Sequence, residues 1–228
     1  MNTITRMSPI KMRRSSRSNV RLTVIVATII FLVAAVIFGN IGEDVASGDP
    51  LTLLDAQIAT WFHMHTTPSL TYFMWGVSYI YGVLGISVGA LLFGAFLVRK
   101  REWFWLKYLV LAVLGGMLLN VLIKDIFGRT RPTFSDPILS LASYSFPSGH
   151  VAGTTLLYGV IAVFITSRID SRALRASVVF FTLCMITLVA LSRLYLGAHF
   201  LSDVVAAFAE GVAWLAFCFT ALQLLRRN

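Results

Sequence analysis

The chain has 228 residues, of which 57% are hydrophobic and only 13% are charged. Soluble domains contain about 45–50% apolar residues, and here the excess forms several unbroken runs. This composition excludes a soluble globule, a disordered chain and a small disulfide scaffold. The net charge of +9 would suggest a nucleic-acid partner in a soluble protein. The basic residues instead stand in short clusters between apolar runs, as in membrane proteins, so we expect no nucleic-acid partner.

Six apolar segments are long enough to cross a bilayer, which requires about 20 helical residues. In chain order they are residues 22–41, 70–98, 103–123, 151–167, 176–191 and 204–225. The sequence therefore predicts an all-α, polytopic membrane protein with six transmembrane helices in a bundle. We divide it into a basic N-terminal segment, residues 1–21, and a six-helix domain, residues 22–228.

The distribution of Lys and Arg predicts the orientation of this bundle. Fourteen of the 19 lie before the first segment, between the second and third, between the fourth and fifth, or after the sixth, and Lys107 adjoins the second of these groups, which makes fifteen on one side. The positive-inside rule then places both termini in the cytoplasm, with the protein in the cytoplasmic (inner) membrane.

The Arg-rich start could bind nucleic acid or lipid, but a topology signal that touches anionic headgroups explains it. Residues 51–65 carry apolar side chains at helical spacing, which predicts a short amphipathic helix on the outer interface.

Four cations remain on the outer side, next to most of the other reactive residues. Lys124-x6-Arg131-Pro132 ends the third segment, and Pro147-Ser148-Gly149-His150 precedes the fourth. Ser192-Arg193-x5-His199-x3-Asp203 joins the fifth segment to the sixth. The orientation depends on basic residues outside these three motifs. It is therefore independent evidence that the three motifs lie on the same face of the membrane.

The residue types in these motifs suit a phosphate ligand. Lys124, Arg131 and Arg193 supply positive charge and guanidinium forks that match phosphate oxygens. Ser148 is placed to cap a helix whose N-terminus faces outward, and Gly149 lets the backbone approach an anion closely.

The same motifs contain the groups that phosphoryl transfer requires. His199 and Asp203 are four residues apart, hence on one face if helical, so Asp203 can hold one ring nitrogen while the other attacks. His150 comes from a separate loop and is available to protonate the leaving oxygen. Arg129 lies outside the motifs, and we expect it to contact only lipid headgroups.

These residues resemble the type 2 phosphatidic acid phosphatase family, the membrane relatives of vanadium haloperoxidases and bacterial acid phosphatases. The three-part signature of that family matches Lys124 to Pro132, Pro147 to His150 and Ser192 to Asp203 without a departure. The resemblance implies that His199 forms a phosphohistidine, that Asp203 orients it and that His150 protonates the leaving group. It also implies a set of residues that bind the phosphoryl oxygens without a metal or other cofactor, namely Lys124, Arg131, Ser148, Gly149 and Arg193.

The expected activity is hydrolysis of the terminal phosphate of a lipid phosphate or diphosphate at the periplasmic or extracellular face. Undecaprenyl diphosphate, phosphatidylglycerophosphate, phosphatidic acid and lipid A phosphate all qualify as substrates. A lipid phosphotransferase would use the same residues and differ only in the access of an acceptor. Vanadate-dependent halide oxidation is less compatible with six spans. An anion channel or transporter would spread ionisable residues along a path through the bilayer, whereas here they cluster at one face.

Glu210 and the pair His63 and His65 are further candidates for a functional role. Glu210 lies seven residues beyond Asp203 inside the last apolar segment, where an acid is costly, and we interpret it as a protonated, hydrogen-bonded packing residue. His63 and His65 could suggest a metal, but residues two apart on a helix point in different directions, so we predict no metal site.

Overall fold

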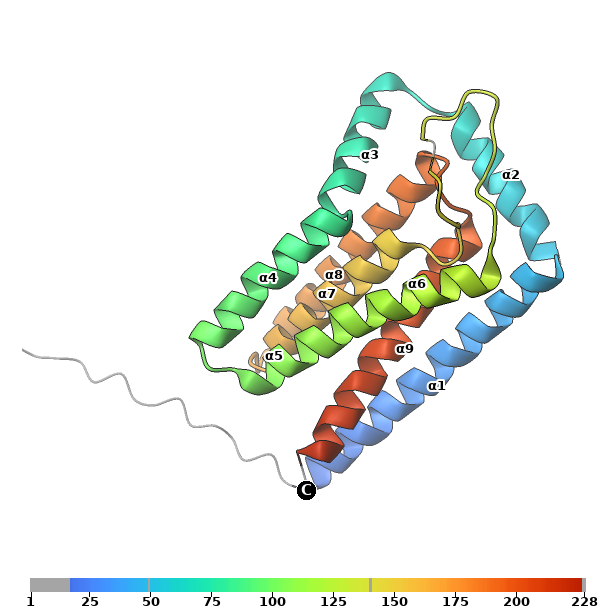
Figure 1. Cartoon of the computed structure of the whole chain (residues 1–228). Coiled ribbons are helices and arrows are strands. Elements are labelled where there is room, and N and C mark those ends of the chain that lie inside the picture. The colour runs from blue at the N-terminus through green and yellow to red at the C-terminus, as the bar shows by residue number, and fades with distance from the viewer. Residues whose placement is uncertain (1–16, 49, 140, 227–228) are drawn as a thin grey trace, which may run out of the picture.

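The computed structural model describes residues 17–48, 50–139 and 141–226, and every regular element in that part of the chain is a helix. The helices form one bundle (Figure 1). In chain order they are α1 (Arg17–Ser47), α2 (Pro50–Met64), α3 (Pro68–Ile80), α4 (Val83–Arg99), α5 (Trp103–Val110), the π-helical η1 (Leu111–Gly115), α6 (Gly116–Phe127), α7 (Gly149–Thr166), α8 (Arg172–Tyr195) and α9 (Leu201–Leu225). Most of the predicted basic segment, residues 1–16, lies outside the described residues.

The predicted six-helix membrane bundle is confirmed. Five helical stretches are long and apolar enough to cross a membrane, namely Arg21–Ser47, Trp103–Phe127, Gly149–Thr166, Arg172–Tyr195 and Leu201–Leu225. The pair α3 and α4 makes the sixth span when counted together. Two details differ from the sequence prediction: this second span bends by 47°, and the third contains the η1 segment.

The absence of a side chain at Gly85 permits the bend between α3 and α4. Gly82 is the N-cap of α4 and has an extended backbone. A Cβ atom on Gly85 would lie 1.6 Å from the carbonyl oxygen of Ile80. Any side chain at Gly85 would therefore collide with the end of α3, and the close approach depends on the glycine.

Helix α7 lies at the centre of the bundle, in contact with α4, α5, α6, η1, α8 and α9. Its buried side chains join two hydrophobic clusters. One contains Leu156 and Val160 together with residues of α4, α5 and α9, and the other contains Val151 with residues of α3, α8 and α9. The central position of α7 fixes its first residues, which belong to the second motif, against the ends of the neighbouring helices.

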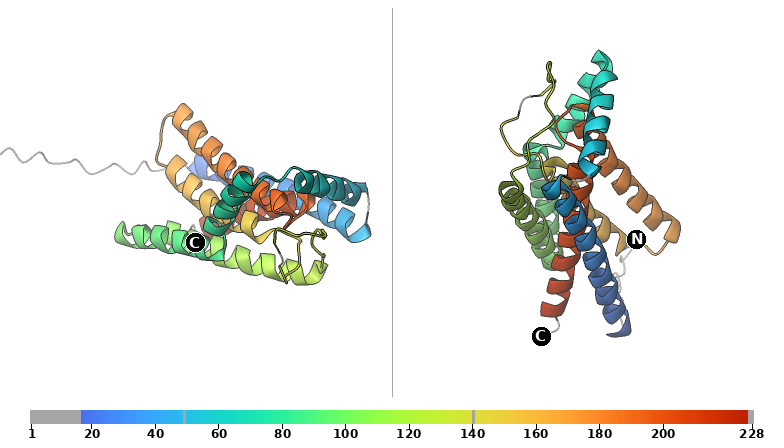
Figure 2. Two further views of the ribbon diagram at one scale, coloured as in Figure 1. Left: turned by 90° about the horizontal axis from the view of Figure 1, so that it is seen from above. Right: turned by 90° about the vertical axis from the view of Figure 1, so that its right-hand side faces the viewer.

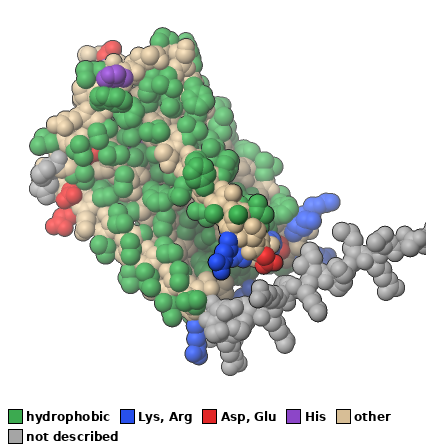
Figure 3. Space-filling view, turned by 180° about the vertical axis from the view of Figure 1, so that it is seen from behind, with side chains coloured by type: hydrophobic (Ala, Val, Ile, Leu, Met, Phe, Trp, Pro, Cys, Tyr) green, Lys and Arg blue, Asp and Glu red, His purple; other side chains and the backbone are tan. Residues whose placement is uncertain are grey.

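The basic loops and the three motifs lie at opposite ends of the bundle. The α4–α5 and α7–α8 connections share one end with the C-terminus, whereas the α1–α2, α2–α3, α6–α7 and α8–α9 connections share the other (Figure 1). We call the latter the motif end. A broad hydrophobic surface separates the two ends on the face that Figure 3 shows, with most of the Lys and Arg side chains near the lower end and His at the upper end. Large exposed apolar patches of this kind mark membrane surfaces in proteins.

Helix α2 turns back across the motif end after α1, as Figures 1 and 2 show. The helix predicted at residues 51–65 is present as α2. Leu53, Trp61 and Met64 are exposed on α2, whereas Asp55 and Ala59 are buried against the bundle.

Candidate active site

The three motifs meet at the motif end because two helix boundaries and one backbone hydrogen bond bring them together. Helix α6 carries Lys124 in its last turn and ends at Phe127. The next residue, Gly128, caps it with a left-handed backbone (φ 57°), which suits glycine at a helix C-terminus. The loop of residues 129–147 then leads back to α7. The backbone N–H of Ser148 donates to the carbonyl oxygen of Asp203 at 3.1 Å, which joins the second motif directly to the third.

His199 and Asp203 are paired, although not by the helical spacing that the sequence suggested. Helix α9 begins at Leu201, so His199 precedes it. The His199 Nδ1 atom nevertheless lies 3.4 Å from Asp203 Oδ2. The same carboxylate oxygen accepts a hydrogen bond from the backbone N–H of Phe200 at 2.9 Å, which anchors Asp203 to the N-terminus of α9.

The contacts of the His199 ring assign its tautomer. Nε2 lies 3.2 Å from Nη1 of Arg131, and a guanidinium can only donate. Nε2 is therefore the unprotonated nitrogen, and Nδ1 carries the proton that faces Asp203. Burial lowers the pKa of His199 to about 4, assisted by the charges of Arg193 and Arg131 and opposed by Asp203. The ring is consequently neutral at neutral pH, with a free lone pair on Nε2.

Two of the predicted phosphate-binding cations also hold the loop over the site. Lys124 Nζ donates to the carbonyl oxygens of Tyr144 at 3.0 Å and Ser145 at 3.3 Å. Arg131 donates from Nε to the carbonyl oxygen of Ser143 at 2.7 Å and from Nη2 to that of Tyr144 at 3.1 Å. The two cations therefore lie side by side under the same stretch of loop.

The third cation, Arg193, is held by the end of α3. It is only 2% exposed, and its Nη1 donates to the hydroxyl of Ser78. Its Nε is buried without a hydrogen-bond partner among the described residues. A Cβ on Gly82 would lie 3.5 Å from His150 Nε2, so the bend between α3 and α4 borders both Arg193 and His150. Sequence reasoning missed Ser78 and Gly82, because small residues inside an apolar run are more often packing residues.

Ser148 and Gly149 occupy the predicted helix N-terminus, with one correction. Ser148 is the N-cap residue of α7, but its side chain makes no capping hydrogen bond. Its hydroxyl is buried without a partner in the part of the chain that the structure describes. The predicted N-cap position is therefore correct, but the capping hydrogen bond is absent. The hydroxyl is free to meet a ligand oxygen, as are the first backbone N–H groups of α7. A Cβ on Gly149 would lie 3.4 Å from Asn120 Oδ1, so α6 packs closely here.

The expectation that Arg129 contacts only headgroups is wrong. Its Nη1 donates to Asp203 Oδ1 at 2.7 Å and to the hydroxyl of Ser202 at 2.6 Å. Its Nη2 donates to Asp55 Oδ2 of α2 at 2.8 Å. Neither Asp55 nor its pairing was predicted, because the distance along the sequence between Asp55 and the motifs carries no signal.

Glu210 makes the kind of contact expected of a packing residue. Its side chain is buried, and Oε2 accepts a hydrogen bond from Asn120 Nδ2 at 2.8 Å. This contact joins α9 to α6 about two turns below Asp203.

His63 and His65 do not share a site. His63 Nε2 lies 3.0 Å from Asp136 Oδ1, and its ring stacks on Phe134 of the same loop. His65 Nδ1 lies 2.7 Å from the carbonyl oxygen of Trp61. Among the residues that the structure describes, no group of three His, Cys, Asp or Glu is placed to hold a metal ion.

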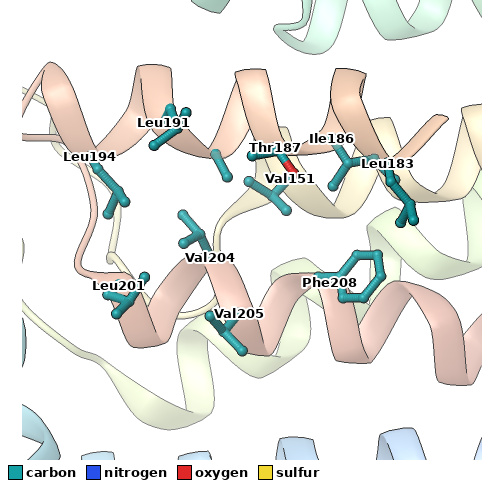
Figure 4. A pocket seen from close by; sticks show the side chains of 11 residues that line it. Val151, Leu183, Ile186, Thr187, Leu191, Leu194, Leu201, Val204, Val205 and Phe208 are labelled. Carbon is teal, nitrogen blue, oxygen red and sulfur yellow. The ribbon is translucent and has the colours of Figure 1, made fainter. Parts of the chain in front are cut away.

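An apolar cavity of about 310 Å³ lies between α8 and α9, next to the site. Thr187 is the only hydroxyl residue among its lining residues (Figure 4). Three lining residues directly follow site residues in the sequence, namely Val151, Leu194 and Val204, and Leu201 lies two positions after His199. In the right-hand view of Figure 2, α8 diverges from α9 below the connection that joins them. The cavity is lined by Val151 of α7, by residues 183–194 of α8 and by residues 201–208 of α9.

Known proteins contain sequences similar to this chain. A family model described as the PAP2 superfamily matches residues 105–227. The chain belongs to this superfamily. It is 36% identical over 129 residues to phosphatidylglycerophosphatase B of Bacillus subtilis, a match that spans 56% of this chain and 60% of the relative. It is 28% identical over 151 residues to lipid A 4'-phosphatase of Porphyromonas gingivalis, spanning 54% of this chain and 62% of the relative. The matches thus span about three fifths of each relative.

Solved structures support the same assignment. The crystal structure of a transmembrane PAP2 type phosphatidylglycerolphosphate phosphatase from Bacillus subtilis has a TM-score of 0.72 and 26% identity, covering 85% of this chain and 94% of that one. LpxE of Aquifex aeolicus has a TM-score of 0.57 and 21% identity, covering 73% and 94%, and shows a similar fold. The resemblance to the type 2 phosphatidic acid phosphatases is therefore confirmed. The family model begins inside α5, so α1 to α4, with Asp55 and Ser78, lie outside it.

Proposed function

We propose that the chain is an integral membrane phosphohydrolase that removes the terminal phosphate of a lipid phosphate or diphosphate through a phosphohistidine on His199. One observation carries the proposal: the unprotonated Nε2 of His199 faces Arg131, while its Nδ1 faces Asp203. A nucleophilic nitrogen beside an oxyanion-binding cation, with the opposite nitrogen held by a carboxylate, is the arrangement that covalent catalysis at phosphorus requires.

The first chemical step would form the phosphoenzyme. The lone pair of His199 Nε2 attacks phosphorus, and the bond from phosphorus to the lipid oxygen breaks. Arg131 transfers its donor from Nε2 to a phosphoryl oxygen as the substrate enters. His150 gives a proton to the departing oxygen. Asp203 stabilises the positive charge that develops on the imidazole ring.

The second step would release phosphate. A water molecule gives its proton to His150 and attacks phosphorus, and the bond from phosphorus to Nε2 breaks. The product is inorganic phosphate, and His199 returns to its neutral form. Through both steps Lys124, Arg131 and Arg193 bind the phosphoryl oxygens and stabilise the charge of the transition state.

The remaining phosphate ligands come from the N-terminus of α7. The Ser148 hydroxyl and the Gly149 backbone N–H face the same end of the helix, where the helix dipole favours an anion. Two site residues, Ser148 and Arg193, each have a buried donor atom, Oγ and Nε respectively, without a partner among the described residues, and phosphoryl oxygens would use this hydrogen-bonding capacity.

The cavity between α8 and α9 supports a lipid substrate. Its apolar lining suits an alkyl or isoprenyl chain, and a lipid bound there would have its headgroup near His199. We place the site at the outer face of the cytoplasmic membrane, because the basic loops lie at the opposite end of the bundle. The names of the curated relatives make phosphatidylglycerophosphate the first substrate to test and lipid A 4'-phosphate the second.

The test is phosphate release by the purified full chain in detergent, with EDTA present. The panel is phosphatidylglycerophosphate, phosphatidic acid, undecaprenyl diphosphate and lipid A. His199→Ala is the inactive variant, and His63→Ala is the matched control, because it removes a histidine from the motif end that does not touch His199. We expect release by the wild type and by His63→Ala, and an acid-labile 32P-phosphoenzyme that is absent from His199→Ala. Release that persists in His199→Ala, or no release from any lipid by folded wild type, would overturn the proposal.

A further inference from the structure

Asp55 of α2 is a buried carboxylate whose partners all surround Asp203. It is completely buried, and Oδ1 accepts a hydrogen bond from the backbone N–H of Ser202 at 2.9 Å. Oδ2 accepts from the Ser202 hydroxyl and from Arg129 Nη2 at 2.8 Å. A buried carboxylate is tolerated only when it is paired and hydrogen-bonded. Both partners of Asp55 are themselves bonded or adjacent to Asp203.

Arg129 connects Asp55 to Asp203. Nη2 of the guanidinium binds Asp55, and Nη1 binds Asp203 Oδ1 at 2.7 Å. The guanidinium carbon also lies 4.3 Å from the centre of the Phe200 ring, a distance at which a cation and an aromatic face attract. Asp203 therefore uses Oδ1 for Arg129 and Oδ2 for His199, so the position of Arg129 sets the orientation of the carboxylate toward the imidazole.

The charge balance around Asp203 depends on both Arg129 and Asp55. Arg129 alone would draw the negative charge of Asp203 away from His199 and weaken the stabilisation of an imidazolium. Asp55 places a second negative charge on the opposite side of the same guanidinium. The three groups together keep a net negative charge beside His199, at distances where Coulomb interactions in a buried site are strong.

We propose, on the basis of the phosphohistidine function proposed above, that Asp55 and Arg129 form a positioning pair that holds Asp203, and through it His199, in the orientation for attack. Neither residue needs to touch the substrate. Helix α2, which lies outside all three motifs and outside the family model, thereby completes the active site. The alternative role for a cation at this end is direct binding of a phosphate, and the two roles make different kinetic predictions.

The test compares Asp55→Asn with wild type, using the lipid that wild type hydrolyses fastest. The substitution keeps the size of the side chain but removes the negative charge that compensates Arg129. It also places the Asn amide N–H₂, a donor, next to the groups of Ser202 or Arg129 that donate to Asp55. We expect kcat to fall about 10–100-fold, as is typical when a residue that orients a reacting group is changed. KM and inhibition by orthovanadate, a phosphate analogue, should change less than about threefold, because the phosphate ligands are untouched. Asp55→Glu should recover part of the lost rate.

Asp136→Asn is the matched control. Asp136 also ties α2 to the motif end, through His63 at 3.0 Å, but its side chain is 81% exposed and does not touch Asp203. This variant should keep kcat within about twofold of wild type. Thermal unfolding of each variant separates a loss of rate from a loss of fold.

Ser202→Ala is the second variant, for the case that Asp55→Asn does not accumulate as folded protein. It removes the hydroxyl that both Arg129 and Asp55 bind but keeps the two charges paired, and we expect a several-fold lower kcat. Folded Asp55→Asn or Ser202→Ala with wild-type kcat would overturn the proposal. A loss of vanadate affinity as large as the loss of kcat would also overturn it, because the pair would then bind phosphate. Failure of the proposed function itself would show in wild type and His199→Ala, independently of Asp55.

Discussion

The substitution Gly85→Ala tests whether the bend between α3 and α4 positions the active site. Gly85 has no predicted role in chemistry and lies inside a span. A Cβ at this position would lie 1.6 Å from the carbonyl oxygen of Ile80, whereas real Cβ contacts essentially never fall below 3.0 Å. The neighbour is backbone, so it cannot rotate away. The end of α3 must therefore move by at least about 1.4 Å relative to α4.

The consequence for activity follows from what the end of α3 holds. Ser78 lies two residues before Ile80 and accepts the hydrogen bond from Arg193. A misplacement of about 1 Å among groups that position a substrate can cost on the order of 100-fold in rate. We therefore expect Gly85→Ala to lower kcat/KM about 100-fold, which corresponds to roughly 3 kcal/mol of lost transition-state stabilisation.

Gly76→Ala in α3, the other half of the same bent span, is the control. A Cβ on Gly76 meets nothing within 4 Å, and replacing a helical glycine with alanine stabilises a helix by roughly 0.5–1 kcal/mol. Phosphate release measures activity. Stability is measured in a Cys184→Ala background, because Cys184 is only half-buried, with a thiol-reactive fluorophore that labels the buried Cys218 on unfolding. Equal activity and equal unfolding temperature of Gly85→Ala and Gly76→Ala would refute the steric account of the bend.

Three further predictions concern the site, its cavity and its buried acid. Burial lowers the pKa of His199 to about 4, so protonation of this residue should reduce kcat/KM with a midpoint near pH 4. The measured pH profile is first corrected for the substrate phosphate, which titrates near pH 6. A midpoint near the ordinary histidine pKa of about 6.5 would contradict the prediction. The folded state binds this proton more weakly than the unfolded chain, so stability should decline as the pH falls from about 6.5 to 4, and His199→Gln should lose that part of the decline. Ala190→Phe places a ring in the cavity between α8 and α9. It should lower kcat/KM about 10-fold for a long-chain lipid, roughly the burial energy of two methylenes, but less than threefold for a water-soluble phosphate ester. Equal losses for the two substrates would exclude a lipid chain in the cavity. Glu210→Gln keeps an acceptor for Asn120 and should retain activity within about threefold, whereas a loss as large as that of His199→Ala would show that its role is not packing.

The sequence by itself determined the membrane architecture and the composition of the motif end. Runs of apolar residues long enough to span a bilayer have few alternatives, because every backbone polar group in lipid must be satisfied within a helix or closed barrel. The distribution of Lys and Arg predicted that the motifs lie at the end of the bundle opposite the basic loops, as they do. The pairing of His199 with Asp203 was also predicted, but the helical spacing offered as its reason does not apply, because His199 lies outside the helix.

Only the tertiary structure decided which residues support that site. Asp55 contacts Ser202 across 147 positions of the chain, and Arg193 contacts Ser78 across 115. Local periodicity reports which face of a helix is apolar, but it does not report which polar residue of another helix that face will meet. The role of Arg129 changed for the same reason, from a headgroup contact to a bridge between two buried carboxylates. Such partners depend on how α2, α3 and α9 pack, and packing is a property of the whole bundle.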